Sequence, residues 1–453
     1  MKLKNSKYAD ASHAIRLLKR IEARQCTVGI MGLGYVGLPL ALASIEAGFK
    51  VLGFDTNQSR VDQLNGGDSG MKHISSAAIV DAVEKDKFEA TNDFSRLSEA
   101  DAILIAVPTP LTRNREPNLS FVERSTQAIA DVLRPGQLIV LESTTWPGTT
   151  REVMQPPLEA NGLKAGKDFF LAFSPEREDP GNDKHSTATI PKVVGADDPT
   201  SLALARALYD ALVVRTVPVS SAAAAEAVKL TENIFRSVNI ALVNELKVIF
   251  EKMGIDVWEV IDAAKTKPFG YMPFYPGPGL GGHCIPIDPF YLTWKARELE
   301  ITTRFIELAG EINTNMPHYV VDRLLEGLDR RSGRALKGAR ILLIGMSYKK
   351  NIEDTRESPS LRLIELIEHR GAKVHYHDPY VAGIPPTREH PKLAGRRSVA
   401  LSAGTLASYD AVVISTDHDG IDWKLVGKSA KLVVDTRNAC ARNGVKGAHI
   451  IKA

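Results

Sequence analysis

The stretch Gly32-Leu33-Gly34-Tyr35-Val36-Gly37 decides the fold of this chain, because it carries three glycines in the pattern GxGxxG. It directly follows a short apolar run, Thr27 to Met31, and a helical pattern over Leu38 to Ala47 comes next. A second predicted strand, Lys50 to Phe54, then leads to Asp55. Such a motif between a strand and a helix, with an acidic residue about twenty residues further on, is typical of a dinucleotide-binding βαβ unit.

This unit predicts a particular cofactor. Glycines allow a tight turn and let a pyrophosphate approach the N-terminus of the helix, where the helix dipole favours anions. Asp55 would hydrogen-bond the ribose hydroxyls of adenosine and repel a 2′-phosphate, which favours NAD over NADP. The alternative is a glycine turn that binds no ligand. The expected cofactor contacts in this unit are Gly32, Gly34, Tyr35, Val36, Gly37 and Asp55.

Strands and helices continue to alternate after this unit. Two apolar runs, 101–107 and 137–141, predict buried strands that end near Thr109 and Thr144. Because open α/β sheets bind ligands outside the carboxyl ends of their strands, both threonines are candidate cofactor contacts, although such residues also commonly form turns. A further predicted strand, 169–173, leads to Glu176, which is a candidate general base at the same rim.

The middle of the chain has a helical pattern. Residues 222–253 contain no glycine or proline, and a helix of this length would span about 45 Å. Lys229 and Asn233 are four residues apart on it and share one face, although a lysine on a long helix is commonly a solvated charge. Further helices are expected over 255–265, 289–299 and 303–328.

A loop between two of these helices presents a cysteine. Residues 277–289 contain four glycines and three prolines, which excludes a helix interior or a central strand. Cys284, with Asp288 four residues later, is a candidate nucleophile, and a small buried cysteine in a tight loop is the alternative. We do not expect a metal at His283 and Cys284, because adjacent residues rarely both point at one ion.

The C-terminal part resembles the N-terminal part in its pattern. A basic linker, 330–337, precedes a strand over 339–345, and later runs end at Asp378, Ser415 and Asp435. The glycine motif is missing, and the segments 346–351 and 354–358 stand in its place. Their lysines and arginine either bind the phosphates of a second nucleotide or are solvated charges.

Composition narrows the class of protein. The chain has 453 residues, a formal charge of +3 and three distant cysteines, which argues against nucleic-acid partners, membrane affinity and a disulfide framework. No signal peptide or transmembrane run is predicted, so we expect a cytoplasmic protein. The patterns predict an α/β protein with two Rossmann-like doubly wound domains joined by an all-α central domain with a long helix. The expected divisions are a helical extension over 1–26, an NAD-binding domain over 27–217, a helical domain with the cysteine loop over 218–330, and a second Rossmann-like domain over 331–453.

With these features in this order, the chain resembles the UDP-glucose/GDP-mannose dehydrogenase family from about Thr27 onward. The most specific matches are 32–39, 226–233, 281–288 and 348–358. The resemblance implies NAD as the cofactor, a UDP-sugar as the substrate and a homodimer. It also implies oxidation of the C6 alcohol to a carboxylate with two NAD per turnover, in which the last domain binds the UDP-sugar.

The resemblance implies roles for residues already singled out. Cys284 would attack the C6 aldehyde, forming a thiohemiacetal that is then oxidised to a thioester. Lys229, Asn233 and Asp288 would order the attacking water and stabilise the oxyanion, and Glu176 would act as a base in the later steps. The other implied contacts are those with the substrate, from Glu176, Arg177, Lys229, Asn233, Gly281 and Lys350, and that with the cofactor, from Arg356.

The substrate is also inferred from resemblance. The UDP-glucose branch commonly carries a lysine where this chain has Ile287. The runs 276–291 and 142–148 are more similar to the branch that oxidises UDP-N-acetylglucosamine for surface polysaccharides, and UDP-N-acetylmannosamine and UDP-glucose are the alternatives. A two-electron hydroxyacid dehydrogenase and a non-catalytic NAD-binding protein are more distant hypotheses, which the second Rossmann-like half and the retained thiol argue against.

Overall fold

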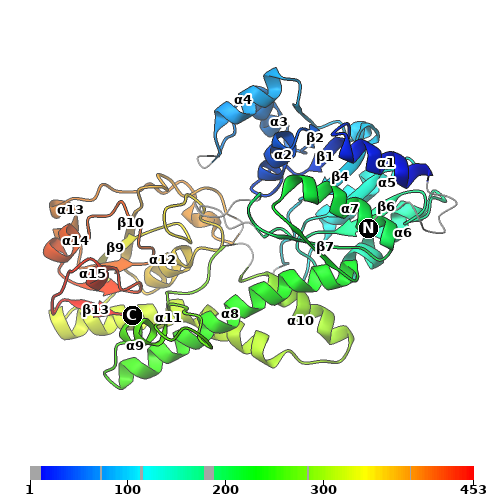
Figure 1. Cartoon of the computed structure of the whole chain (residues 1–453). Coiled ribbons are helices and arrows are strands. Elements are labelled where there is room, and N and C mark those ends of the chain that lie inside the picture. The colour runs from blue at the N-terminus through cyan, green and yellow to red at the C-terminus, as the bar shows by residue number, and fades with distance from the viewer. Residues whose placement is uncertain (1–11, 72–73, 113–115, 178–187, 283–284, 388) are drawn as a thin grey trace. The chain divides into compact units, whose positions relative to one another are not determined.

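The computed structural model describes residues 12–71, 74–112, 116–177, 188–282, 285–387 and 389–453, which form two compact units (Figure 1). The first unit contains the described residues of 1–232 together with 290–300. The second contains those of 233–289 and 301–453. The predicted nucleophile Cys284 and its neighbour His283 lie outside the described residues, as do the first eleven residues of the expected N-terminal extension.

An eight-stranded sheet forms the centre of the first unit, in the order β3-β2-β1-β4-β5-β6-β7-β8. Neighbouring strands are parallel except β6 and β7, which pair antiparallel. The carboxyl ends of β1 to β6 therefore meet at one rim. The strands are β1 Thr27–Met31, β2 Lys50–Phe54, β3 Phe88–Thr91, β4 Ala102–Ile105, β5 Leu138–Leu141, β6 Phe170–Phe173, β7 Lys192–Gly195 and β8 Thr216–Val219.

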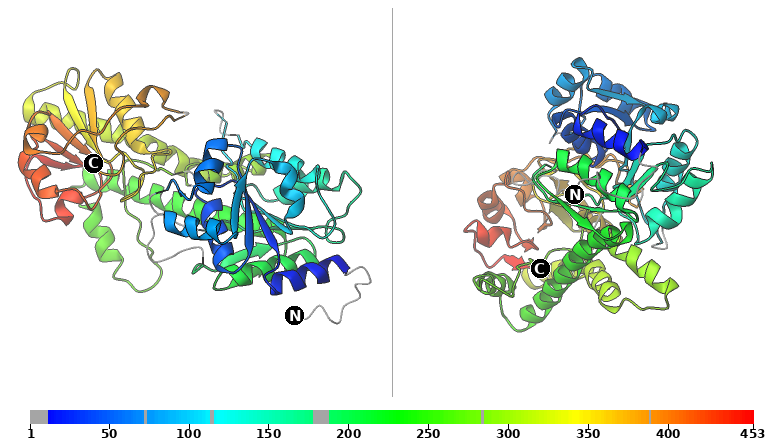
Figure 2. Two further views of the ribbon diagram at one scale, coloured as in Figure 1. Left: turned by 90° about the horizontal axis from the view of Figure 1, so that it is seen from above. Right: turned by 45° about the vertical axis from the view of Figure 1, so that its right-hand side comes forward.

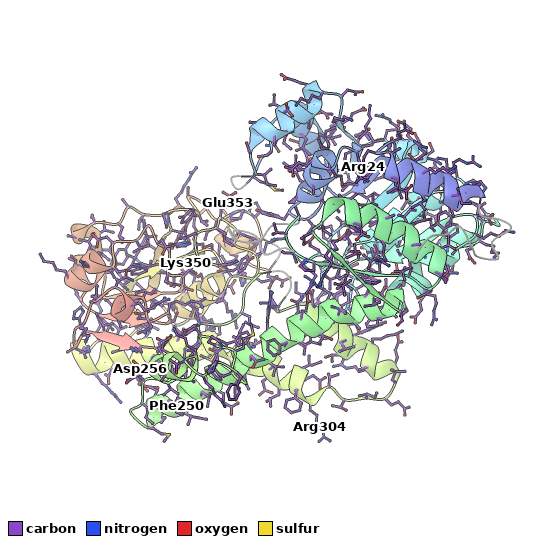
Figure 3. All side chains as sticks on the ribbon, in the orientation of Figure 1. Arg24, Phe250, Asp256, Arg304, Lys350 and Glu353 are labelled. Atoms are coloured by element: carbon purple, nitrogen blue, oxygen red, sulfur yellow. The ribbon has the colours of Figure 1, made fainter. Side chains whose placement is uncertain are left out.

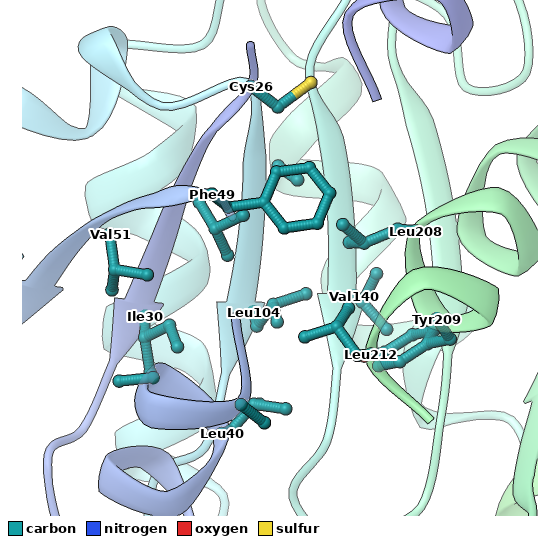
Figure 4. Close-up of a cluster of buried hydrophobic side chains, with 14 of the residues drawn as sticks. Cys26, Ile30, Leu40, Phe49, Val51, Leu104, Val140, Leu208, Tyr209 and Leu212 are labelled. Atoms are coloured by element: carbon teal, nitrogen blue, oxygen red, sulfur yellow. The ribbon is translucent and has the colours of Figure 1, made fainter. Parts of the chain in front are cut away.

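Helices flank this sheet (Figure 2). The apolar side chains of its strands are buried. On one face, Ile30, Leu104 and Val140 of the strands pack with Leu40 and Leu208 of two helices (Figure 4). These side chains alternate with those that face the other side, as the period of two along a strand requires. The helices are α1 Ser12–Glu22, α2 Gly37–Glu46, α3 Gln58–Asn65, α4 Ser76–Glu84, α5 Ser120–Ala130, α6 Gln155–Glu159 and α7 Pro199–Leu212, with short turns η2 Phe94–Glu99 and η3 Thr150–Met154.

The predicted long helix is confirmed, and α8 covers Ala222–Lys252. Beyond it, Asp256 caps the next helix by accepting a hydrogen bond from the backbone N–H of Trp258 at 3.1 Å. Phe250, near the end of α8, packs against a small apolar cluster that includes Trp258 (Phe250 and Asp256 are labelled in Figure 3). The remaining helices of this region are α9 Val257–Ala264, α10 Asp288–Glu298 and α11 Arg304–Ser332.

The second unit contains a five-stranded parallel sheet in the order β10-β9-β11-β12-β13. The prediction of two Rossmann-like sheets with a helical region between them in sequence is therefore confirmed. In the described part of the chain, no helix is long and apolar enough to cross a bilayer. The elements are β9 Arg340–Ile344, α12 Pro359–His369, β10 Lys373–His377, η4 Pro391–Leu393, α13 Ala403–Ala407, β11 Ala411–Ile414, α14 Trp423–Ser429, β12 Val433–Asp435, α15 Ala439–Arg442 and β13 Ile450–Lys452.

A buried lysine lies on α8 within the second unit. Lys247 is 3% exposed, and its Nζ has no hydrogen-bond partner among the described residues. The ammonium lies 5.1 Å from the ring centre of Tyr319 on α11. Burial, with the positive charges of Arg437 and Arg323, lowers the pKa of Lys247 to about 7. The charged amine therefore costs folding free energy at neutral pH.

Replacing this lysine should stabilise the protein in a pH-dependent way. The folded pKa is about 7 and an unfolded lysine titrates near 10.4, so the stability of the wild type should rise with pH between these values. Lys247→Met should be more stable than the wild type by about 3 kcal/mol at pH 6, and the difference should shrink toward pH 10. Urea unfolding at both pH values measures this, with the exposed Lys252→Met on the same helix as the control. Equal stabilities at pH 6 would contradict the prediction.

Candidate active site

The glycine turn after β1 is shaped by close contacts that exclude side chains. Gly32 has a φ of 91°, and a Cβ there would lie 2.6 Å from the carbonyl oxygen of Ala106. A Cβ at Gly37 would lie 1.7 Å from the carbonyl oxygen of Gly32. A Cβ at Gly34, in contrast, would meet nothing within 4 Å among the described residues. The turn therefore has one position open to a ligand beside the N-terminus of α2, as a pyrophosphate requires.

Asp55 lies where the ribose of a dinucleotide would be bound. It follows β2, and its carboxylate accepts hydrogen bonds from the backbone N–H groups of Leu33 at 3.1 Å and Asn57 at 2.9 Å. The carboxylate is only half-buried and has lone pairs left for the adenosine hydroxyls. The first turn of α2 carries no acidic residue that would repel a phosphate. The residues present therefore fit NAD.

The loops after β4 and β5 pack against α10. Thr109 is buried, and its carbonyl oxygen accepts a hydrogen bond from the hydroxyl of Tyr291 at 2.8 Å. Thr144 lies in the loop after β5, where Trp146 stacks on Tyr291 with 6.2 Å between ring centres. The backbone around both predicted cofactor contacts is thus fixed at the rim of the sheet.

A buried carboxylate on α8 holds the same loop. Glu226 is fully buried and accepts hydrogen bonds from the backbone N–H of Gly148 at 2.5 Å and from the N–H and hydroxyl of Thr150 at 2.9 and 2.7 Å. Burial raises the pKa of Glu226, while these hydrogen bonds act to lower it. The sequence analysis included this glutamate only as part of a matching segment, since nothing in its spacing indicates a partner 76 residues away.

Glu176 lies between two lysines at the end of β6. Its backbone carbonyl oxygen accepts a hydrogen bond from Nζ of Lys229 at 2.5 Å. Its carboxylate lies 3.8 Å from Nζ of Lys192, which begins β7. The Glu176 side chain is 13% exposed and that of Lys192 is 4% exposed. A predicted base and a predicted cation, 53 residues apart in sequence, are therefore neighbours in the first unit.

Arg177 is engaged by protein groups. One of its terminal nitrogens donates to the carbonyl oxygen of Pro191 at 2.7 Å, and the other donates to Glu232 of α8 at 2.5 Å. These bonds hold the start of the segment after β6 against α8. Any contact of Arg177 with a substrate would have to be made beside these two bonds.

In the second unit, Asn233 and Asp288 form a buried pair. The side-chain amide of Asn233 donates to the Asp288 carboxylate at 2.6 Å, and both residues are nearly inaccessible, at 2% and 1% exposure. Asp288 begins α10, so the pair ties the end of the cysteine loop to the long helix. The sequence analysis assigned both residues to one chemical step, and the structure brings their side chains into contact.

The glycines of the cysteine loop pack on the segment after β9. A Cβ at Gly281 would lie 2.5 Å from Cβ of Tyr348, and one at Gly282 would lie 2.9 Å from its ring. The backbone N–H of Gly282 donates to the carbonyl oxygen of Arg356 at 3.1 Å. Two segments predicted to contribute to one site are thus in direct contact within the second unit.

The basic residues of that segment have acidic neighbours. Lys350, labelled in Figure 3, forms an ion pair with Asp419 at 2.5 Å. Arg356 forms an ion pair with Asp354 at 2.6 Å. Both basic side chains are more than 40% exposed, so these pairs are worth little and can open for a ligand.

The predicted residues are therefore found in two groups. The first unit contains Gly32, Gly34, Tyr35, Val36, Gly37, Asp55, Thr109, Thr144, Glu176, Arg177 and Lys229. The second contains Asn233, Gly281, Asp288, Lys350 and Arg356. The sequence analysis missed Lys192 and Tyr209, which meet Glu142 at the rim of the first sheet.

A glycine turn that fits NAD, on a doubly wound sheet followed by a second Rossmann-like half, defines an NAD-dependent oxidoreductase with two nucleotide-binding domains. The chain matches three models of the UDP-glucose/GDP-mannose dehydrogenase family: the NAD binding domain over residues 26–213, the central domain over 223–315 and the UDP binding domain over 342–442. The chain therefore belongs to the UDP-glucose/GDP-mannose dehydrogenase family. It is an NAD-dependent nucleotide-sugar dehydrogenase of the UDP-hexosamine branch, and its substrate is a UDP-sugar.

Relatives of known name span almost the whole chain. A UDP-N-acetyl-D-glucosamine 6-dehydrogenase of Pseudomonas aeruginosa is 35% identical, over 86% of this chain and 90% of the relative. An NDP-N-acetyl-D-galactosaminuronic acid dehydrogenase of Ralstonia nicotianae is 34% identical, over 91% and 95%. The solved structure of a UDP-N-acetyl-D-mannosamine dehydrogenase from Pyrococcus horikoshii has a TM-score of 0.83 at 32% identity and covers 94% of this chain and 98% of that chain.

Removing the carboxylate of Asp55, the predicted contact for the ribose, should weaken NAD binding and reduce discrimination against NADP. Asp55→Ala loses the acceptor for the adenosine hydroxyls and the charge that repels a 2′-phosphate. We expect the Kd for NAD to rise about tenfold or more, and the Kd for NADP to rise less or fall. Calorimetric titration with both dinucleotides measures this, with the exposed Asp62→Ala of α3 as the matched control. An equal rise in the Kd for NAD and for NADP would show that Asp55 does not discriminate between their ribose groups.

Proposed function

We propose that this dehydrogenase oxidises the C6 alcohol of UDP-N-acetylglucosamine to the carboxylate, reducing two NAD per sugar, in the synthesis of surface polysaccharide precursors. The observation that carries the proposal is the buried pair of Asn233 and Asp288. Asp288 follows Cys284 by four residues. A carboxylate fixed there by an amide suits the ordering of the water that a thioester needs. The choice of sugar is supported by the similarity of residues 276–291 and by the Pseudomonas aeruginosa relative.

The proposed reaction uses the predicted residues in sequence. Glu176 acts as the base in the later steps, and bound NAD supplies the chemistry of hydride acceptance in both oxidations. Cys284 captures the aldehyde, and Lys229 stabilises negative charge on the sugar oxygen. Asn233 and Asp288 orient the water that releases the acid. The remaining proposed contacts are those with the substrate from Arg177, Gly281 and Lys350, and that with the cofactor from Arg356.

We also propose that each domain of the chain has its own function. Residues 27–217 hold NAD, 218–330 carry the cysteine loop, and 331–453 bind the UDP-sugar, after a helical extension over 1–26. The cytoplasm is the proposed location. It is supported by the free thiols of Cys26 and Cys440, which are buried and unpaired with each other.

The test is the amount of NADH formed for each molecule of sugar consumed. Purified protein should form about two NADH per UDP-N-acetylglucosamine, because one active site completes both oxidations. Cys284→Ala should abolish the second oxidation, because it lacks the thiol that captures the aldehyde. UDP-N-acetylmannosamine and UDP-glucose are run in parallel, with Cys440→Ala as a control for the loss of a thiol.

Each outcome points to one reaction. A higher kcat/KM with UDP-N-acetylmannosamine, the substrate named for the Pyrococcus horikoshii relative, would replace the proposed sugar. One NADH per sugar would mean that the aldehyde is released, and the thioester role of Cys284 would be wrong. Full turnover by Cys284→Ala would favour an ordinary two-electron dehydrogenase.

We propose that the protein is a homodimer that pairs through α8. Phe235, Leu242 and Ile249 recur every seven residues on this helix and are 46%, 52% and 44% exposed, and Met253 continues the row at 63%. Apolar residues with this spacing form one stripe on a helix. A stripe this exposed suits packing against a second copy of the same helix.

Charges placed in this stripe should separate the two copies. Leu242→Glu combined with Ile249→Glu puts carboxylates at the proposed contact, where burying them would cost several kcal/mol. We expect the molar mass from light scattering to fall from that of a dimer to that of a monomer. Val80→Glu, at an exposed apolar position on α4, is the control. A monomeric wild type, or a double variant that remains dimeric, would contradict the proposal.

A further inference from the structure

A chain of buried polar groups crosses the rim of the first sheet. Nζ of Lys192 donates to one carboxylate oxygen of Glu142 at 2.5 Å, and the hydroxyl of Tyr209 donates to the other. The same ammonium donates to the carbonyl oxygen of Pro175 at 3.3 Å and lies 3.8 Å from the Glu176 carboxylate. Three strand ends and α7 therefore contribute to one connected network.

The two sides of Lys192 differ in their access to solvent. On one side, Glu142 and Tyr209 are fully buried, at 0% exposure. On the other side, the Glu176 side chain is 13% exposed and lies at the rim where ligands of such sheets bind. An ion pair that served only stability would need no second carboxylate on the open side, and replacing it with apolar residues would often be neutral or stabilising.

The charges of the network depend on one another. Burial raises the pKa of Glu142, the charge of Lys192 lowers it, and the charge of Glu176 raises it further. Burial and Glu142 raise the pKa of Tyr209 well above its usual value, so its hydroxyl remains a donor. From α8, Lys229 bonds the backbone of Glu176, and Glu232 is bonded by Arg177. Two carboxylates of the described residues, those of Glu142 and Glu176, thus compete for the ammonium of Lys192.

We propose that Lys192 is a positioning residue of the oxidation proposed above: its ammonium, aligned by Glu142 and Tyr209, holds the Glu176 carboxylate as an anion at the end of β6. An ionised Glu176 is the form that can accept a proton as a base. Lys192 would act through Glu176 and need not touch the substrate. The inference rests on the proposed function for the role of Glu176 as the base.

The test compares the titration of Glu176 in Glu142→Gln with its titration in derivatives of Glu142→Gln that differ in the charge at residue 192. In Glu142→Gln the charge that repels Glu176 is gone, and Glu176 is the one carboxylate left near the ammonium among the described residues. The titration midpoint of Glu176 should therefore fall below that of the wild type. Adding Lys192→Met to Glu142→Gln removes the cation and leaves no buried charge unpaired, and the midpoint should rise by about one to two pH units relative to Glu142→Gln. Adding Lys192→Arg instead should keep the low midpoint. Glu142→Gln with Lys85→Met, a change at an exposed lysine, is the control.

Two readouts separate this inference from the proposed function. The acidic limb of the pH profile of kcat reports the base during turnover, and its shift should occur with little change in KM. The ¹³Cδ resonance of Glu176, assigned by its loss in Glu176→Gln, titrates without substrate. A wild type that oxidises no UDP-sugar would contradict the proposed function, and the resonance would still test Lys192.

Equal ¹³Cδ midpoints in Glu142→Gln and its Lys192→Met derivative would overturn the inference. If that derivative does not fold, Glu142→Gln with Lys192→Gln takes its place, and the same rise of the Glu176 titration midpoint relative to Glu142→Gln is expected. A shift reversed by arginine supports the positioning role, because loss of stability alone would lower activity without moving the titration of Glu176.

Discussion

The contact between the first glycine turn and β4 is the constraint on which the first unit depends. The carbonyl oxygen of Ala106 occupies the place of a side chain at Gly32, and that of Gly32 occupies the place of one at Gly37. Only with both side chains missing can the chain turn from the end of β1 at Met31 into α2 at Gly37, with the helix N-terminus at the rim. The N-terminus of α2, Asp55 and the ends of β4 and β5 then lie at the rim where sheets of this kind bind ligands.

Buried carboxylates determine the shape of the rest of this rim. Glu226 accepts hydrogen bonds from the backbone of the loop after β5 and has no cationic partner among the residues that the structure describes, and Glu142 accepts hydrogen bonds from Lys192 and Tyr209. Burial disfavours both anions, so each is retained only because its oxygens are satisfied. Each carboxylate connects segments at least 50 residues apart, and together they fix the loops between which Glu176 emerges.

The parts that could be predicted from the sequence are those that depend on short-range patterns. A few residues in a row are enough to predict the glycine turn, the apolar strands and the uninterrupted helix α8, and the structure confirms these elements. The strands β7 and β8 were not predicted, because each has four residues and one contains Pro218, which an edge strand tolerates. The contact of Lys192 with Glu142 has no periodic signal, because its 50-residue separation follows from the order of strands in the sheet.

Both Rossmann-like halves carry an aspartate directly after their second strand, but the two carboxylates differ in burial and in hydrogen-bond partners. Asp55 after β2 bonds the N–H of Leu33 and stays half-buried, whereas Asp378 after β10 bonds the N–H groups of Met346 and Ser347 and is 3% exposed. Burial opposes its charge, but the hydrogen bond and positive charge of His418, together with backbone N–H groups, lower the pKa of Asp378 to about 2. An aspartate so fully engaged shapes the loop after β9 and has no capacity left for a ribose. A nucleotide bound by the second half would have to use other groups, and the loop after β9 carries lysines and an arginine where the first half has its glycine motif.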